Sequence, residues 1–178
     1  MGGTQKGLLL MDANVVIDLC EADPTVIALV SEHIGRVHIP LPVLLEEVEQ
    51  VRKEDWTSLG IVAVDPPLKT ALVAAARRAG LSFHDRLCLL LARDNGWTCV
   101  TNDIRLRREC QSDGVPVLWG LELLAMLVER DVLTATAAAQ LGRAIHRTNP
   151  RFITAQVLER FLGRIGAKRA RKKARKPK

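Results

Sequence analysis

Four acidic positions, far apart in the sequence, have the residue types and settings of one catalytic site. Asp12 and Asp103 each follow a short apolar run, and Asp85 begins a stretch with helical spacing. The fourth acid is Glu46 or its neighbour Glu47, and the charge pattern does not distinguish between them. Carboxylates that lie together repel each other unless a cation neutralises them, and oxygen ligands suit Mg²⁺ or Mn²⁺. Such an ion can activate water beside a phosphate, so the pattern predicts metal-assisted hydrolysis of a phosphodiester.

Each acid also has a purely structural explanation. Asp12 and Asp103 precede helical patterns and could cap those helices, while Ser82 and Asp85 have the spacing of a capping box. Glu46 could simply face solvent. The set of four acids favours a site more strongly than any single member does.

Two polar residues and one histidine lie close to these acids in the sequence. Asn14 is two residues after Asp12, and Thr101 is two residues before Asp103. Both are predicted to orient water or a phosphate. The four histidines show no spacing typical of a metal site or a catalytic dyad, although His84, which adjoins one of the acids, could contact substrate.

The elements that must position these residues alternate between strand and helix. Short apolar runs predict strands at residues 7–11, 36–39, 61–65, 97–101 and 115–119. Helical spacing, with Pro, Ser and Gly at the ends, predicts helices at residues 13–20, 24–34, 43–53, 66–78, 82–95, 104–112 and 121–130. This alternation predicts a parallel sheet with helices on both faces, a three-layer α/β/α domain. Chemistry in such open sheets gathers at the carboxyl ends of the strands.

Length and composition limit the protein to one core. The chain has 178 residues, of which 48% are hydrophobic, enough for a single well-buried domain with appendages. Its four cysteines show no CxxC spacing, so free thiols in a reducing cytoplasm are expected. The N-terminal apolar run is interrupted by acids and falls short of the about 20 residues that span a bilayer, so neither a membrane segment nor a signal peptide is expected.

The strand and helix alternation stops beyond Asp131. Residues 134–147 and 154–165 have the pattern of two amphipathic helices, separated by Thr148-Asn149-Pro150. From Lys168 to Lys178, eight residues are Lys or Arg and none is acidic, so the rest of the chain carries about −2 of the total charge of +6. We expect a catalytic domain at 1–130, a helical extension at 131–166 and a basic tail at 167–178 that is disordered when free and suited to binding phosphates.

Four segments of the sequence resemble the PIN-domain nuclease family, which includes the VapC toxins of toxin-antitoxin pairs. They read LLLMDANVVIDL, IPLPVLLEEV, LSFHDRLCLLLARDNGW and CVTNDIRL, and the resemblance covers about residues 6 to 130. It implies a parallel sheet flanked by helices and an acidic site that cleaves RNA with Mg²⁺ or Mn²⁺. The family's motif acids fall here on Asp12, Glu46, Asp85 and Asp103, because in similar relatives the second acid lies six residues after the Ile-Pro proline.

The resemblance also implies binding partners, and at one position this sequence departs from the family pattern. RNA is the expected substrate, a cognate antitoxin a possible partner, and a homodimer the expected assembly. Many relatives carry a further acid two residues after the Asp103 position, where this chain has Arg105, which leaves a second metal ion in question.

Other classes of protein fit the sequence less well. A haloacid-dehalogenase-like phosphatase needs a second aspartate where this chain has Asn14, a response-regulator receiver needs adjacent acids near the first strand, and no GxGxxG or P-loop is found. A catalytically idle RNA-binding protein, with the acids acting only as helix caps, stays open as the alternative, and so does a housekeeping role in RNA processing.

Overall fold

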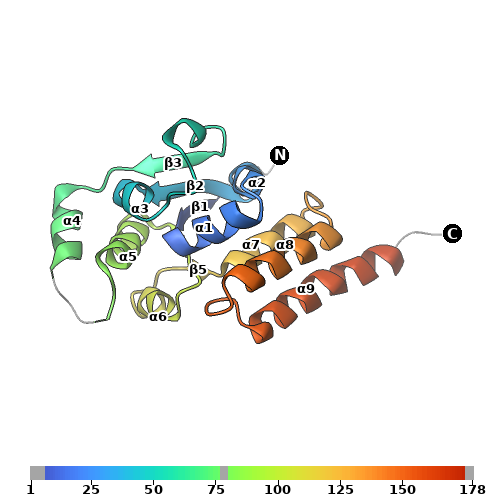
Figure 1. Ribbon diagram of the computed structural model, residues 1–178. Coiled ribbons are helices and arrows are strands. Elements are labelled where there is room, and N and C mark those ends of the chain that lie inside the picture. Colours follow the sequence, from blue (N-terminus) through green and yellow to red (C-terminus); the bar gives the residue numbers. More distant parts are fainter. Residues whose placement is uncertain (1–6, 77–79, 175–178) are drawn as a thin grey trace, which may run out of the picture.

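The predicted parallel sheet is confirmed in the computed structural model, which describes residues 7–76 and 80–174 (Figure 1). Within these residues the sheet has five strands in the order β3-β2-β1-β4-β5, and every neighbouring pair is parallel. The strands are β1 (Gly7–Met11), β2 (Gly35–Pro40), β3 (Ile61–Val64), β4 (Thr98–Val100) and β5 (Val117–Leu118). Their carboxyl ends therefore share one edge, with β1 at the centre.

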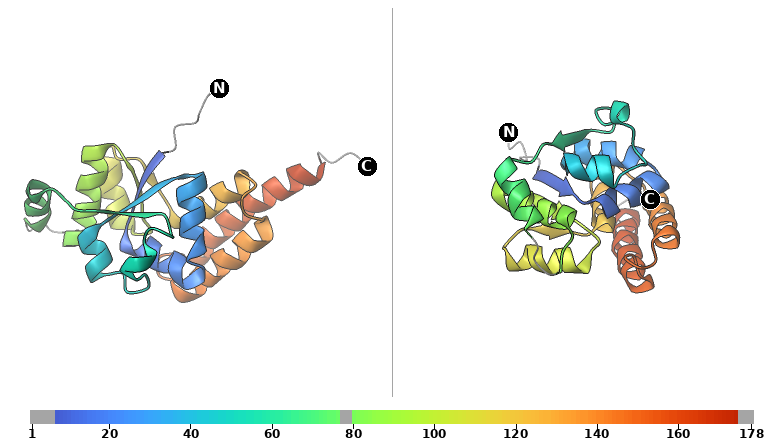
Figure 2. Two further views of the ribbon diagram at one scale, coloured as in Figure 1. Left: turned by 90° about the horizontal axis from the view of Figure 1, so that it is seen from above. Right: turned by 60° about the vertical axis from the view of Figure 1, so that its left-hand side comes forward.

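Helices cover both faces of the sheet. They are α1 (Ala13–Ala22), α2 (Thr25–His33), α3 (Leu41–Glu46), α4 (Leu68–Ala75), α5 (Phe83–Asn95), α6 (Ile104–Ser112) and α7 (Gly120–Glu129), followed by α8 (Ala135–Thr148) and α9 (Ala155–Ala174). The chain runs from β1 to β3 in one direction and then returns past β1 to β4 and β5. Right-handed crossovers consequently place α5 and α6 on the face opposite α1 and α2, and the left view of Figure 2 shows this division.

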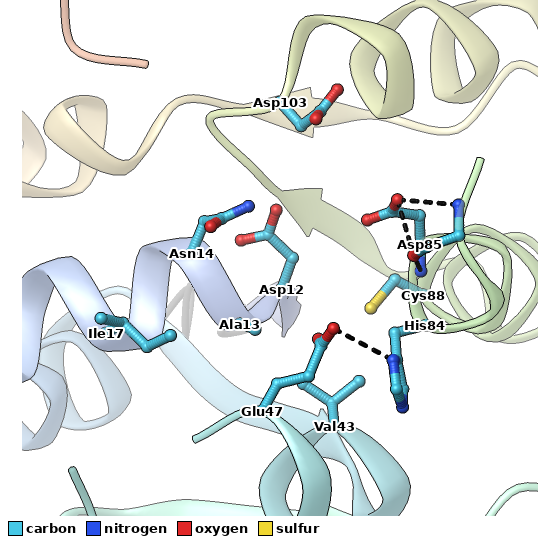
Figure 3. Close-up of a pocket in the computed structure, with 11 residues that line it drawn as sticks. Asp12, Ala13, Asn14, Ile17, Val43, Glu47, His84, Asp85, Cys88 and Asp103 are labelled. Carbon is cyan, nitrogen blue, oxygen red and sulfur yellow. Dashed lines mark hydrogen bonds and ion pairs between the residues drawn. The ribbon is translucent and has the colours of Figure 1, made fainter. Parts of the chain in front are cut away.

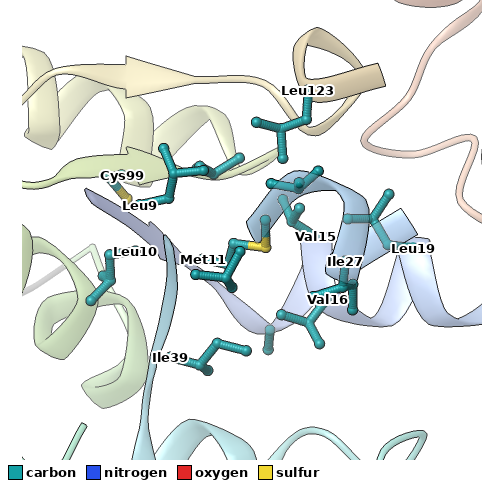
Figure 4. Packing of buried hydrophobic residues seen from close by; sticks show 14 of the residues in the cluster. Leu9, Leu10, Met11, Val15, Val16, Leu19, Ile27, Ile39, Cys99 and Leu123 are labelled. Atoms are coloured by element: carbon teal, nitrogen blue, oxygen red, sulfur yellow. The ribbon is translucent and has the colours of Figure 1, made fainter. Parts of the chain in front are cut away.

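The core forms where β1 meets the helices around it (Figure 4). Leu10 and Met11 of β1 are fully buried, as are Val15 and Val16 of α1. A central strand that is covered on both faces needs apolar side chains in both directions. This explains why β1 reads as an unbroken apolar run rather than an alternating one.

The C-terminal helices belong to the same core. Helix α8 packs against α1 and α7, and α9 packs against α7 and α8 (Figure 1). Ile145, Ile153 and Phe161 are buried together with residues of the sheet. Gly142 lets α8 approach α9 closely, because a Cβ at this position would lie 2.5 Å from the Phe161 ring.

Two predicted elements were wrong in extent. The helix predicted at residues 43–53 is the shorter α3, followed by irregular chain and a 3-10 turn at Lys53–Asp55. Burial of Val48, Val51 and Trp56 explains the difference, since these side chains turn the backbone towards the core. The helix predicted at 66–78 begins at Leu68, and its predicted end at 77–78 lies outside the described residues.

The basic tail also differs from its expected disorder. Helix α9 continues to Ala174, into the segment expected to be disordered, and the last four residues lie outside the described part. Ala, Lys and Arg are strong helix formers, and adding turns to an existing helix avoids the cost of nucleation. Across the described residues, no helix combines the length and the apolar character that crossing a bilayer requires.

Candidate functional site

An acidic cavity of about 230 Å³ lies at the carboxyl edge of the sheet (Figure 3). The carboxylate residues that line it are Asp12, Glu47, Asp85 and Asp103, and they come from four separate segments of the chain. Asp12 follows β1 and Asp103 follows β4, which are adjacent strands. The parallel topology thus brings together the three predicted aspartates.

Asp12 is the most buried of these acids, with 3% of its surface exposed. It caps α1: its Oδ1 accepts a hydrogen bond from the Val15 amide at 3.0 Å, and its Oδ2 accepts one from the Thr101 hydroxyl. Burial raises the pKa of Asp12 to about 7, although these two hydrogen bonds lower it; the charge of Asp85 adds to the rise. An ionised Asp12 is therefore costly without a nearby cation.

Asp85 and Asp103 each use one carboxyl oxygen to cap a helix. Asp85 Oδ2 accepts hydrogen bonds from the backbone N and Oγ of Ser82, at 3.1 and 2.8 Å, in the capping box of α5. Asp103 Oδ1 accepts hydrogen bonds from the amides of Arg105 and Leu106, at 2.6 and 3.1 Å, at the start of α6. The second oxygens, Asp85 Oδ1 and Asp103 Oδ2, receive no hydrogen bond from a described residue. Capping thus holds each aspartate in place and leaves an oxygen available to a ligand.

Three helix N-termini point their partial positive charge towards the cavity. Asp12 and Asp103 are the N-caps of α1 and α6, and Asp85 lies in the first turn of α5, whose N-cap is Ser82. Carboxylates are stabilised near a helix N-terminus by about 0.3–1 kcal/mol each at exposed positions. The two explanations of the aspartates, as caps and as site residues, are therefore compatible.

The fourth acid in the cavity is Glu47, which corrects the prediction of Glu46. Glu46 does not line the cavity, and its side chain is 61% exposed, against 36% for Glu47. Helix α3 ends at Glu46, and Glu47 follows with non-helical dihedral angles that turn it inwards (Figure 3). Burial raises the pKa of Glu47, and the adjacent His84 opposes this rise. The spacing from Pro40 that the resemblance implied therefore does not identify the glutamate that lines the cavity.

His84 holds both glutamates at the edge of the cavity. Its Nε2 lies 3.0 Å from Glu46 Oε2, and its Nδ1 lies 3.0 Å from Glu47 Oε1. His84 therefore links the end of α3 to the start of α5.

The two residues predicted to orient water or a phosphate differ in their position relative to the cavity. Asn14 lines the cavity. Thr101 is fully buried and does not line it: its hydroxyl donates to Asp12, and its Oγ1 accepts a hydrogen bond from the Asp103 amide at 3.0 Å. Thr101 is thus a positioning residue for two acids rather than a substrate contact.

A buried polar group close to this edge had not been predicted. Asp18 is 4% exposed and accepts hydrogen bonds from Asn102 and Asn149. Burial raises its pKa to about 6, while these two bonds lower it. The signal in the sequence was a single acid on the apolar face of the first helix, but nothing in the sequence indicates its partner 131 residues away.

The residues of the cavity fit a hard divalent cation. The acids offer oxygen ligands only, which is the preference of Mg²⁺ and Mn²⁺, and a cation would offset the cost of ionising the buried Asp12. Among the described residues, no three His, Cys, Asp or Glu side chains are already arranged as a metal-binding cluster.

These features define a class of protein: an α/β domain with an acidic pocket at the carboxyl edge of a parallel sheet. A family model described as PIN domain matches residues 9–110, more than half of the chain, so the chain belongs to the PIN domain family. PIN domains are generally metal-dependent nucleases. Comparison with curated proteins and with solved structures found no match. The matched region ends within α6, before α7, α8 and α9.

Proposed function

We propose that this protein is an endoribonuclease that hydrolyses RNA phosphodiester bonds with Mg²⁺ or Mn²⁺. The observation that carries the proposal is the meeting of Asp12, Glu47, Asp85 and Asp103 around one cavity. Helix capping alone explains three of these acids, but it does not explain why a glutamate from the end of α3 joins them. A shared cation accounts for all four.

The chain's own groups would divide the work as follows. Asp12, Asp85, Asp103 and Glu47 would hold the ion, with Thr101 fixing Asp12 and His84 fixing Glu47. A bound divalent cation lowers the pKa of water and stabilises the charge that develops on the phosphate. Asn14 lines the same cavity and would orient the water or a phosphate oxygen.

The choice of RNA, and of a toxin role, rests on the resemblance to VapC ribonucleases. The segment 168–178 supports a polyanionic substrate, because its eight cations offset the repulsion between phosphates and a slightly acidic body. If the protein is a toxin, expressing it in a bacterial host should arrest growth, and Asp12→Asn should relieve the arrest. A gene for a small DNA-binding protein beside it would identify the antitoxin.

Purified protein tests the enzymatic proposal directly. After treatment with a chelator it should leave single-stranded RNA intact, and added Mg²⁺ or Mn²⁺ should restore cleavage. Asp12→Asn, Asp85→Asn and Asp103→Asn should each abolish most activity while the protein stays folded, because asparagine is also a good helix cap. RNA binding by the folded wild type, without cleavage under any of these metals, would contradict the proposal and support the RNA-binding alternative.

A further inference from the structure

A buried polar network joins the C-terminal helices to the acidic cavity. Asp18 on α1 accepts a hydrogen bond from Asn102 Nδ2 at 2.9 Å and another from Asn149 Nδ2 at 2.8 Å. Asn149 lies at the end of α8, outside the region that matches the PIN domain model. Asn102 lies just after β4, between Thr101 and Asp103. The network therefore spans from the helical extension to the strand end that carries site residues.

The network fixes Asn102 from both sides. Its Nδ2 donates to Asp18, while its Oδ1 accepts a hydrogen bond from the Gly120 amide at 2.9 Å. Asn102 is 1% exposed, and a Cβ at position 120 would lie 3.1 Å from its Nδ2, so the side chain fits tightly against α7. A buried carboxylate is costly unless it is hydrogen-bonded, and without Asn149 the Oδ1 of Asp18 would lose its donor.

The residues on either side of Asn102 hold the acids of the cavity. Thr101 donates to Asp12 and accepts from the Asp103 amide. A shift of the backbone at Asn102 would consequently move Thr101 and Asp103 together, and with them the hydrogen bond that orients Asp12. Two of the four acids thus depend on where Asn102 is held.

We infer that Asp18 and Asn149 are positioning residues, through which the C-terminal helices hold the segment 101–103 in the geometry that binds the metal ion. The helical extension is then part of the catalytic unit and not an appendage to it. The metal and activity readouts of this inference rest on the proposed function, whereas its structural readout does not.

The test compares Asn149→Ala with a matched control in the same extension. Thr134→Ala removes the N-cap of α8, where Thr134 Oγ1 accepts a hydrogen bond from the Ala137 amide at 3.1 Å, and leaves the network untouched. Both variants should lower the melting temperature. Only Asn149→Ala should weaken Mn²⁺ binding, measured by calorimetry, by about threefold to tenfold, since loss of an outer-shell partner typically costs about 10- to 100-fold and Asn149 is one step further from the ion.

Hydrogen exchange gives a readout that does not depend on metal or activity. The backbone amides of residues 101–103 should exchange faster in Asn149→Ala than in Thr134→Ala, when each variant is measured at the same number of degrees below its own melting temperature. Asp18→Asn keeps the shape of the side chain but leaves one of the two amide donors without an acceptor, so it should reproduce the faster exchange. This variant replaces Asn149→Ala in the test if Asn149→Ala does not fold. Loss of stability alone, with exchange at 101–103 equal to that of Thr134→Ala, would overturn the inference.

The outcomes separate the two proposals. Wild-type protein that binds Mn²⁺ but does not cleave RNA refutes the proposed function, and Mn²⁺ affinity and exchange still decide the role of Asn149. If wild-type protein binds no Mn²⁺, the exchange comparison alone decides whether the extension positions the segment 101–103.

Discussion

Replacing Asp12 by asparagine should stabilise the protein in the absence of metal, although it should abolish catalysis. The pKa of Asp12 rises from 3.8 to about 7, mainly because the side chain is buried. Each pKa unit corresponds to about 1.4 kcal/mol, so the ionised carboxylate destabilises the metal-free fold by at most about 4 kcal/mol. Asparagine removes this charge and keeps an oxygen that can cap α1.

The sign of the pH dependence follows from the raised pKa. Between pH 3.8 and about 7 the folded protein keeps a proton that the unfolded chain has released. The free energy of unfolding of the wild type therefore falls as the pH rises through this range and levels off above it. Asp12→Asn has no such proton at this site, so its advantage should grow by about 2 to 3 kcal/mol between pH 5 and pH 8. Asp18 also titrates in this range, but it is present in both proteins and cancels in the difference.

Urea denaturation with a chelator, at pH 5 and pH 8, measures this difference. Added Mn²⁺ should then stabilise the wild type and not Asp12→Asn, because an ion that binds only the folded state shifts the equilibrium towards it. If Asp12→Asn is less stable than the wild type at pH 8, or if the difference does not change with pH, the reasoning about burial and charge is wrong.

Three further predictions concern other parts of the molecule. Glu47→Gln should abolish most RNA cleavage in a gel assay, and the matched Glu46→Gln should retain it, because only the former lines the cavity; the reverse result would restore the register predicted from sequence. Gly142→Ala should lower the free energy of unfolding by about 1–3 kcal/mol, since its Cβ would overlap the Phe161 ring, and an unchanged urea midpoint would contradict the close packing of α8 on α9. Deleting residues 168–178 should weaken RNA binding and reduce its salt dependence. The slope of log binding constant against log salt concentration should fall by about 0.7 for each phosphate that the shortened chain no longer binds. Identical salt curves for the two chains would exclude a role of the tail in binding.

The alternating strand and helix patterns were enough to predict the parallel sheet and its position between helix layers. Asp12, Asp85 and Asp103 could be placed at one edge because parallel strands end together and because helix starts have recognisable chemistry. These inferences succeed because they depend on local spacing and on a topology with few alternatives. The same local signals also made the cap and site explanations of each acid appear to compete, whereas one carboxylate can cap a helix and line the cavity as well.

Tertiary packing decided the features that depend on interactions between distant segments. Val48 and Val51 end α3 early by entering the core, and this places Glu47 rather than Glu46 at the cavity. Neighbouring side chains on a helix point about 100° apart, so a helix that ends one residue early changes which glutamate faces the cavity. Spacing along the sequence does not reveal where the helix ends.

Tertiary packing also determined the link between the helical extension and the cavity. Asp18 and Asn149 are 131 residues apart, and their meeting requires α8 to dock on α1. The sequence by itself determined which elements form and which edge carries the acids. Only the folded structure determined which glutamate faces the cavity and which side chains hold the aspartates, because these depend on burial and on hydrogen bonds that no local pattern encodes.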